Sequence, residues 1–209
     1  MFITLEGIEG SGKTTQIDHI VKFLDQKGIP HLTTREPGGT SIGAKIRSIL
    51  LDPENHALAP VSELLLYAAD RAQHLEICIK PALDAGKTVI CDRYYDATTV
   101  YQGYARGLDL NLIAQLHGLC CKNLMPDITF LLDLPPEIGL KRAWKQIDNG
   151  NRSAYETRFE KEALTFHRKV REGYLQLAQN EPDRFFVIDA AQEARHVSER
   201  VIETLSLML

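Results

Sequence analysis

The sequence lacks the features of a membrane, secreted or nucleic-acid-binding protein. No apolar run approaches the roughly 18 residues of a membrane-spanning helix. The opening residues MFITLE lack the basic start and long apolar stretch of a signal peptide. The 24 basic residues are outnumbered by 28 acidic ones, for a net charge of −4, which argues against DNA or RNA as a main partner. We therefore expect a cytoplasmic protein that acts on small molecules.

Cysteine is scarce as well. Cys78, Cys91, Cys120 and Cys121 form no CxxC pair and show no zinc-like spacing with histidine. We expect reduced thiols, mostly packed in the core, as is usual for cytoplasmic proteins.

Five short apolar runs are present, and helical patterns lie between them. This alternation predicts an α/β protein whose five-stranded parallel sheet is covered by helices on both faces. One long helix is expected around an apolar stripe from Phe159 to Leu177, with SAYE (153–156) as a capping box before it. The expected strands are 2–6, 31–35, 88–92, 128–134 and 184–189.

A phosphate-binding loop is predicted directly after the first strand. Residues 7–14 are GIEGSGKT, a full match to GxxxxGK[ST] between a predicted strand and a predicted helix. Glycines let successive backbone N–H groups converge on one anion, and the helix start adds its positive dipole end. Lys13 would reach the β- and γ-phosphates of ATP, and the Thr14 hydroxyl would ligate Mg²⁺. The alternative is a glycine-rich turn that carries a lysine by chance. The expected ATP-binding residues are Gly7, Ile8, Glu9, Gly10, Ser11, Gly12, Lys13, Thr14 and Thr15.

The rest of the chain favours a small kinase over a GTP switch or a large ATPase. No NKxD base-reading motif is present, and the one DxxG, residues 25–28, ends the first predicted helix. Large ATPases need more chain than 209 residues. A kinase needs a second pocket for the molecule that accepts the phosphate.

Two places provide candidates for that second pocket. Tyr67, Arg71 and His74 lie at i, i+4 and i+7, so they share one helix face, where an aromatic and an arginine can stack on a base and donate to its carbonyl edge. Asp92 and Arg93 stand at the C-terminal end of a buried strand, the edge at which open α/β sheets bind ligands. Asp92 would hold a Mg²⁺-bound water there. The alternatives are a packed tyrosine with a solvated arginine, and an ordinary surface ion pair.

Taken together, these stretches resemble the thymidylate kinase family, which phosphorylates dTMP to dTDP with ATP. The stretches that carry the resemblance cover nearly the whole chain. They are GIEGSGKT (7–14), TREPGGT (34–40), LLLYAADRAQH (64–74), CDRYYDATTVYQG (91–103) and DLPPEIGLKRA (133–143).

The resemblance implies a three-layer P-loop NTPase fold in a single domain, 1–209, with a short lid at about 143–158. It also implies ATP and Mg²⁺ as cofactors, dTMP as substrate in dTTP biosynthesis, and a homodimer formed through helices beside the active site. By this resemblance the chain is a phosphotransferase with a phosphate group as acceptor.

The resemblance also implies roles for individual residues. Tyr67 would stack on thymine and Arg71 would bond its O4. Arg93 would grip the dTMP phosphate, Glu9 would contact the sugar 3′-OH region and orient that arginine, and Tyr101 would stand close to the sugar C2′. Further substrate contacts are expected from Pro37, Thr98 and Gln102, with a phosphate contact from Arg47.

The catalytic arginine is expected from the lid. The interior of the phosphate loop, residues 8–11, has no arginine, which resembles the bacterial type of the family. Arg152 and Arg158 are the candidates, and Arg142 resembles the residue that stacks on adenine. The sequence departs from the family's pattern in two places. Ala97 replaces the serine of the family's DRY stretch, and the lid is several residues longer than in close bacterial members. The predicted catalytic groups are Glu9, Lys13, Arg93, Arg152 and Arg158.

Two other functions remain open from the sequence. One is a different small kinase, acting on a nucleoside or on another nucleoside monophosphate. The other is a non-catalytic ATP-binding module, which would need no acceptor site.

Overall fold

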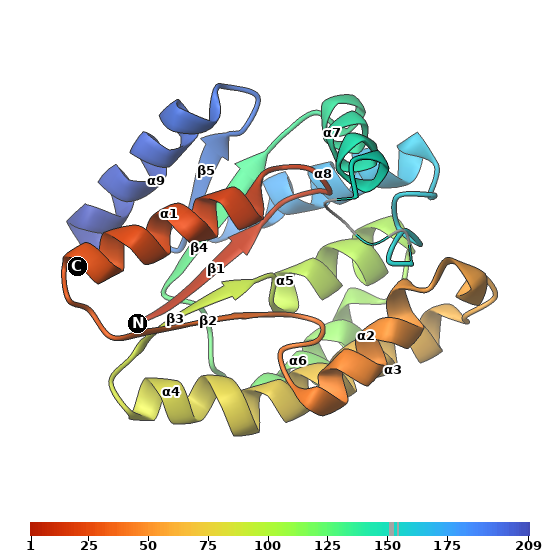
Figure 1. The fold of residues 1–209 in the computed structure, drawn as a ribbon. Helices are drawn as coiled ribbons and strands as arrows, with labels where there is room; N and C mark the ends of the chain where they lie inside the picture. Colours follow the sequence, from red (N-terminus) through yellow and green to blue (C-terminus); the bar gives the residue numbers. More distant parts are fainter. Residues whose placement is uncertain (151–152, 154) are drawn as a thin grey trace.

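The computed structural model describes residues 1–150, 153 and 155–209, and in these residues five strands form one parallel sheet (Figure 1). The strand order is β2–β3–β1–β4–β5. The predicted α/β fold is therefore confirmed, with two strands one residue shorter than expected. The strands are β1 (Phe2–Glu6), β2 (His31–Arg35), β3 (Thr88–Asp92), β4 (Ile128–Asp133) and β5 (Phe185–Asp189).

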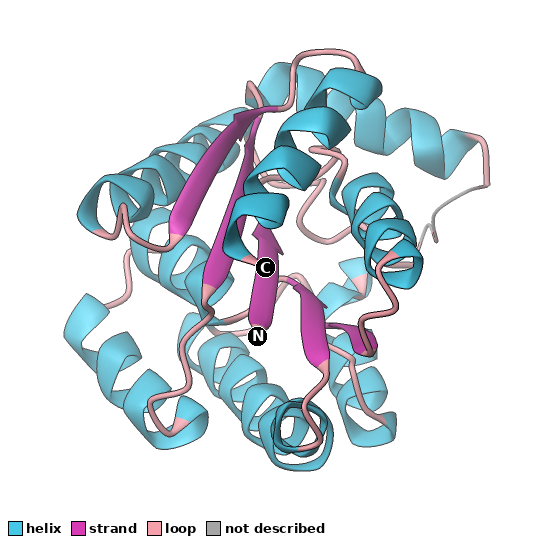
Figure 2. Cartoon of the chain, turned by 90° about the vertical axis from the view of Figure 1, so that its left-hand side faces the viewer, coloured by secondary structure: helices cyan, strands magenta, loops and turns pink. Residues whose placement is uncertain are grey.

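Helices cover both faces of this sheet (Figure 2). On one face α1 (Lys13–Gln26) and α9 (Ala194–Met208) pack against each other. The other face is covered by α4 (Lys80–Asp84), α6 (Leu110–Cys121), α8 (Leu164–Asn180) and the π-helical segment η3 (Thr99–Ala105). Three layers result. The remaining helices are α2 (Ser41–Leu51), η1 (Pro53–Asn55), α3 (Pro60–His74), η2 (Leu75–Ile79), α5 (Tyr95–Thr98) and α7 (Pro136–Asp148).

The central strand β1 buries polar side chains as well as apolar ones. Ile3 and Leu5 share a hydrophobic cluster with Ile20 of α1. On the opposite face Thr4 exchanges a 2.8 Å hydrogen bond with Thr129, and Glu6 accepts one from a tyrosine of α8. Both faces of the strand are buried, as is typical of parallel sheets.

Helix α8 begins at Leu164, so its predicted capping box is wrong. Ser153 instead accepts a hydrogen bond from the backbone N–H of Tyr155, at 3.2 Å, in a local turn. Residues 157–160 are all buried. A surface helix has one apolar stripe and cannot bury four successive side chains, so this segment folds as turns.

The register of the strands brings three chain segments together at one edge. Arg35 of β2 pairs with Asp92 of β3, which pairs with Leu5 of β1. The residues that follow each strand therefore leave the sheet side by side, at the carboxyl edge where α/β proteins bind ligands. In the described part of the chain, no helix has the length and hydropathy needed to cross a membrane.

Candidate active site

The loop between β1 and α1 is shaped by glycines. Gly10 and Gly12 have φ of +70° and +97°, in the left-handed region that favours glycine. A Cβ on Gly10 would also lie 2.1 Å from the backbone oxygen of Gly139 in α7. Lys13 Nζ donates to the carbonyl oxygens of Gly7 and Ile8, at 3.1 Å each. The loop is thus a backbone cradle at a helix start, a suitable site for phosphate groups.

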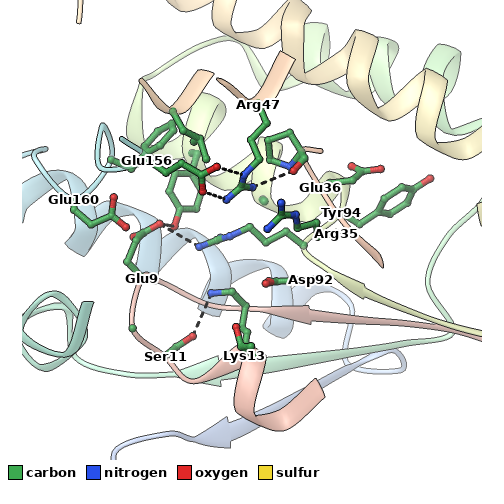
Figure 3. A pocket seen from close by; sticks show the side chains of 18 of the residues that line it. Glu9, Ser11, Lys13, Arg35, Glu36, Arg47, Asp92, Tyr94, Glu156 and Glu160 are labelled. Carbon is green, nitrogen blue, oxygen red and sulfur yellow. Dashed lines mark hydrogen bonds and ion pairs between the residues drawn. The ribbon is translucent and has the colours of Figure 1, made fainter. Parts of the chain in front are cut away.

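A cleft of about 430 Å³ opens beside this loop at the carboxyl edge of the sheet. Figure 3 shows Lys13 and Asp92 on one side of it and Arg47 and Glu156 across it. Of the residues predicted from the sequence, the cleft is lined by Glu9, Gly10, Ser11, Gly12, Lys13, Thr14, Thr15, Pro37, Arg47, Tyr67, Arg71, Asp92, Arg93, Thr98, Tyr101 and Gln102. The structure therefore brings most of the predicted donor and acceptor residues to one place.

Arg93 lies directly after β3 in a left-handed backbone conformation, with φ +67°. Its Nη2 donates to Glu9 Oε1 at 3.1 Å and its Nη1 donates to the hydroxyl of Tyr174 at 3.0 Å. The guanidinium also lies over the ring of Tyr101, 4.9 Å from its centroid. These contacts hold a positive group at the strand tip, facing the phosphate loop.

Glu9 is the carboxylate that fixes this arginine. Its Oε1 accepts a 2.6 Å hydrogen bond from the Tyr101 hydroxyl, and its Oε2 lies 3.3 Å from His167 Nδ1. Burial acts to raise the pKa of Glu9, but His167 and Arg93 outweigh burial and hold that pKa well below the usual range. Glu9 is therefore ionised.

Lys13 and Asp92 face the same end of the cleft (Figure 3). Burial, together with the positive charge of Arg93, lowers the pKa of Lys13 to about 8. Asp92 Oδ1 is buried and has no hydrogen-bond partner among the described residues. A carboxylate oxygen in that state fits Mg²⁺, which typically takes one or two carboxylates and completes its shell with phosphate and water. Thr14 lies at the first turn of α1, where its hydroxyl suits the same ion.

Arg71 and Tyr67 come from α3 and line the other end of the cleft. Arg71 is 2% exposed, and its Nε donates to Glu36 Oε2 at 2.8 Å. Its Nη2 donates to Thr98 Oγ1 at 3.0 Å and to the carbonyl of Tyr94 at 3.2 Å. The guanidinium is thus held by two other chain segments, the turn after β2 and the residues that follow β3, so its direction is determined before any ligand binds.

The structure does not bring Arg158 to the cleft. Its Nη2 pairs with Glu63 at 2.5 Å and its Nη1 donates to the carbonyl of Leu50 at 3.0 Å, in buried surroundings. Arg152, the other candidate, lies outside the described residues. Gly7 and Ile8, at the start of the phosphate loop, do not line the cleft, and their carbonyl oxygens accept from Lys13 Nζ.

A second hollow of about 350 Å³ adjoins the phosphate loop, and Arg142 of α7 lines it with Gly10 and Thr15. Arg142 Nη1 donates to the carbonyl of Ala190 at 3.0 Å. The predicted adenine-stacking residue therefore lies beside the loop, in a hollow that Arg71 does not line.

Two predicted residues are held by partners that the sequence did not indicate. Gln102 donates from Nε2 to Glu63 at 2.7 Å. Arg47 donates to both carboxylate oxygens of Glu156, at 2.9 and 2.7 Å, and to the carbonyl of Pro37 at 3.0 Å. Arg47 therefore links α2 to the segment predicted as the lid.

Four residues of the site were missed: Glu36, Glu63, His167 and Tyr174. Glu36 lies in the TREPGGT stretch, His167 and Tyr174 lie along the apolar stripe, and Glu63 directly precedes LLLYAADRAQH; all four are buried. A charged or polar side chain on the buried stripe of a helix, such as His167 beside Phe166, was the available signal.

Comparisons with known proteins agree with this geometry. A family model for thymidylate kinase matches residues 5–201. The chain is 58% identical over 205 residues to the thymidylate kinase of Desulfosudis oleivorans, covering 98% of this chain and 96% of that one. It is 55% identical over 209 residues to the thymidylate kinase of Desulforapulum autotrophicum, covering 100% and 92%. The crystal structure of thymidylate kinase from Ehrlichia chaffeensis matches with a TM-score of 0.75 and 35% identity, covering 98% of both chains.

Proposed function

Because the chain belongs to the thymidylate kinase family, it phosphorylates dTMP to dTDP with ATP as donor, and we propose how the residues of its cleft share this work. The relatives do not favour the other small kinases considered from the sequence. The reaction is a step in dTTP synthesis.

One observation supports the assignment of the residues more than any other. Lys13, from the cradle after β1, and Arg93, from the tip of β3, line the same cleft, with Glu9 bonded to the arginine. Two positive groups from different chain segments suit a donor phosphate and an acceptor phosphate placed side by side.

The transfer itself then needs little acid–base chemistry. The phosphate of dTMP is largely ionised at neutral pH, so its oxygen attacks the γ-phosphate of ATP without a general base. Lys13 stabilises the phosphate groups on the loop, and Arg93, oriented by Glu9, aims the acceptor. Thr14 and Asp92 would hold Mg²⁺, which neutralises phosphate charge when it is bound. Positioning and charge neutralisation supply most of the rate.

The base and sugar are assigned to the opposite end of the cleft. Tyr67 stacks on thymine, Arg71 donates to its carbonyl edge, and Tyr101 lies at the sugar. The remaining substrate contacts that we propose are Pro37, Thr98 and Gln102. Arg142 lies against adenine in the second hollow, since it lines that hollow beside the loop.

We assign residues 143–158 as a lid within a single domain, 1–209. Arg152 and Arg158 are the two candidates for the catalytic arginine of this lid. The ion pair with Glu63 keeps Arg158 out of the cleft, which favours Arg152. Arg158 is then proposed to fasten the C-terminal end of the lid to α3.

We also propose a homodimer. Helices α2, α3 and α6 pack side by side, and they leave large apolar side chains exposed on their outer surfaces, which is typical of an interface. A second copy covering this surface would support α3, the helix that carries Tyr67 and Arg71. The exposed residues are Ile42, Ile49, Val61, Leu65, Leu112 and Leu119. A cytoplasmic location suits the four cysteines, all of which are free thiols.

The test of the acceptor is a panel of dTMP, dUMP, UMP, CMP, AMP and thymidine, each with ATP and Mg²⁺, followed by ADP release. We expect the highest kcat/KM with dTMP. Equal turnover of AMP contradicts the assignment of the base end, and equal turnover of thymidine contradicts the assignment of Arg93 to an acceptor phosphate. No turnover with any acceptor contradicts catalysis.

A further inference from the structure

A line of buried hydrogen bonds leads from strand β2 to Arg71. Thr34 Oγ1 lies 2.7 Å from His74 Nε2, and His74 Nδ1 lies 2.9 Å from Glu36 Oε1. The other oxygen of Glu36 accepts from Arg71 Nε at 2.8 Å. His74 is 0% exposed and Glu36 is 3% exposed. The line therefore ends at the guanidinium that lines the base end of the cleft.

The chemistry of these groups gives the line one direction. A carboxylate only accepts, so the imidazole Nδ1 must carry a proton and donate to Glu36. The Thr34 hydroxyl donates to Nε2 when the ring is neutral, and it accepts in turn from Cys78 Sγ at 3.9 Å. Both oxygens of Glu36 are then bound by donors on opposite sides, which sets the plane of the carboxylate and, through it, the position of Arg71 Nε.

The surroundings of His74 leave its ring little room. A Cβ on Gly39, in the turn after β2, would lie 2.4 Å from Nε2 of the imidazole and 2.7 Å from Thr34 Oγ1. The backbone of this turn therefore closes over the two side chains, and the imidazole keeps the orientation that serves Glu36.

We propose that His74 is a positioning residue that determines base specificity by fixing, through Glu36, the direction in which Arg71 presents its guanidinium to the nucleobase. A donor held in one place favours a base with a carbonyl at that edge, thymine or uracil, over cytosine with its amino group. This inference rests on the proposed contact of Arg71 with the base.

The test compares variants at both ends of the line. His74→Leu removes the donor to Glu36, whereas His74→Asn places an amide N–H near the position of Nδ1. Thr34→Val is close to isosteric and removes only the bond to Nε2. Thr33→Val is the matched control, because Thr33 is its neighbour on β2 and is exposed.

For each variant, kcat, the KM of dTMP, the KM of ATP and the melting temperature are measured, with dCMP as competing acceptor. We expect His74→Leu to raise the KM of dTMP about tenfold and to lower the preference for dTMP over dCMP by a similar factor, because misplaced positioning groups have effects of this size. The kcat and the KM of ATP should stay near wild type. Thr34→Val should show a smaller shift in the same direction, and His74→Asn should recover most of the preference.

Unchanged preference in His74→Leu and Thr34→Val overturns the proposal, even where the melting temperature falls. If His74→Leu does not fold, Thr34→Val decides alone. Arg71→Ala distinguishes the positioning role of His74 from the proposed contact of Arg71 with the base. If it raises the KM of dTMP while the His74 and Thr34 variants do not, only the positioning role fails. If it has no effect, the proposed base contact itself is wrong.

Discussion

The two ends of the cleft are built in different ways. The donor end is one continuous segment, residues 7–15, whose groups are mainly backbone atoms at a helix start. The acceptor end collects side chains from distant segments: Glu9 and Tyr101 are 92 residues apart, and Arg93 and Tyr174 are 81 apart. A backbone cradle tolerates most side-chain changes but not a change of glycine. A network of buried charges is sensitive to every partner, because an unpaired buried charge is costly.

The largest expected effect is at the acceptor end. Arg93→Ala removes the group that we propose aims the acceptor phosphate, so we expect kcat to fall by about 10³-fold, the range found when an arginine that neutralises transferring phosphate is lost. Arg168→Ala, on the exposed side of α8, is the matched control and should keep wild-type kcat. Near-normal turnover of Arg93→Ala would refute the assignment.

At the donor end, the most damaging substitution should be that of a glycine. Gly10→Ala introduces a Cβ into the backbone of α7 and strains a left-handed residue, so the free energy of unfolding should fall by about 1–3 kcal/mol. The KM of ATP should rise at least about tenfold, because the loop must shift. Gly86→Ala is the control: φ is +73° and no atom lies within 4 Å of the added Cβ. Equal losses of stability in both variants would exclude the clash with α7.

The two ends should also differ in their response to pH. In the free enzyme Lys13 is protonated below its pKa of about 8, and its proposed contact with the phosphates of ATP requires the protonated form. Above pH 8 binding must take up a proton, so the Kd of ATP should rise about fivefold between pH 8 and 9. The pKa of Arg93 is raised by Tyr101, Tyr174 and Glu9 against the effect of burial, so the Kd of dTMP should stay flat.

Calorimetry in buffers of different ionisation enthalpy measures this proton uptake directly. Lys13→Arg, whose charge persists across the range, should make the ATP profile flat. A flat profile in the wild-type enzyme contradicts the lowered pKa.

The smallest expected effect is again at the acceptor end. Tyr101→Phe removes the hydroxyl that donates to Glu9 Oε1. The hydrogen bond from Arg93 to the same oxygen remains. The loss of one hydrogen bond of about 1 kcal/mol should raise the KM of dTMP two- to fivefold and leave the KM of ATP unchanged. Tyr104→Phe, in the same segment, is the control. A change confined to the KM of ATP would place Tyr101 with the donor.

The features that could be predicted from the sequence are those that depend on neighbouring residues: strand bounds, the phosphate loop and residues on one helix face. Strands 2–6, 31–35 and 88–92 have the observed bounds, because apolar runs between helical patterns suffice to mark buried parallel strands. The phosphate loop was predicted because its residues are contiguous. Tyr67 and Arg71 were brought together by helical spacing alone.

What the sequence did not predict depends on partners far along the chain. Arg158 had the features of a lid arginine, yet it pairs with Glu63, 95 residues earlier. The segment 157–160 was assigned to a helix because Phe159 fits a stripe, whereas its neighbours are buried too. No spacing rule contains the tertiary contacts that decide both cases.

The left-handed backbone at Arg93 has a consequence for protein engineering. An L-residue with φ +67° is held in a conformation that favours glycine by about 1 kcal/mol, so Arg93→Gly should melt higher than Arg93→Ala although both lack the guanidinium. A screen for heat resistance that ignores turnover would therefore drift toward glycine at this position. At the tip of β3 some stability of the fold is therefore lost in exchange for an Arg93 side chain that is directed into the cleft.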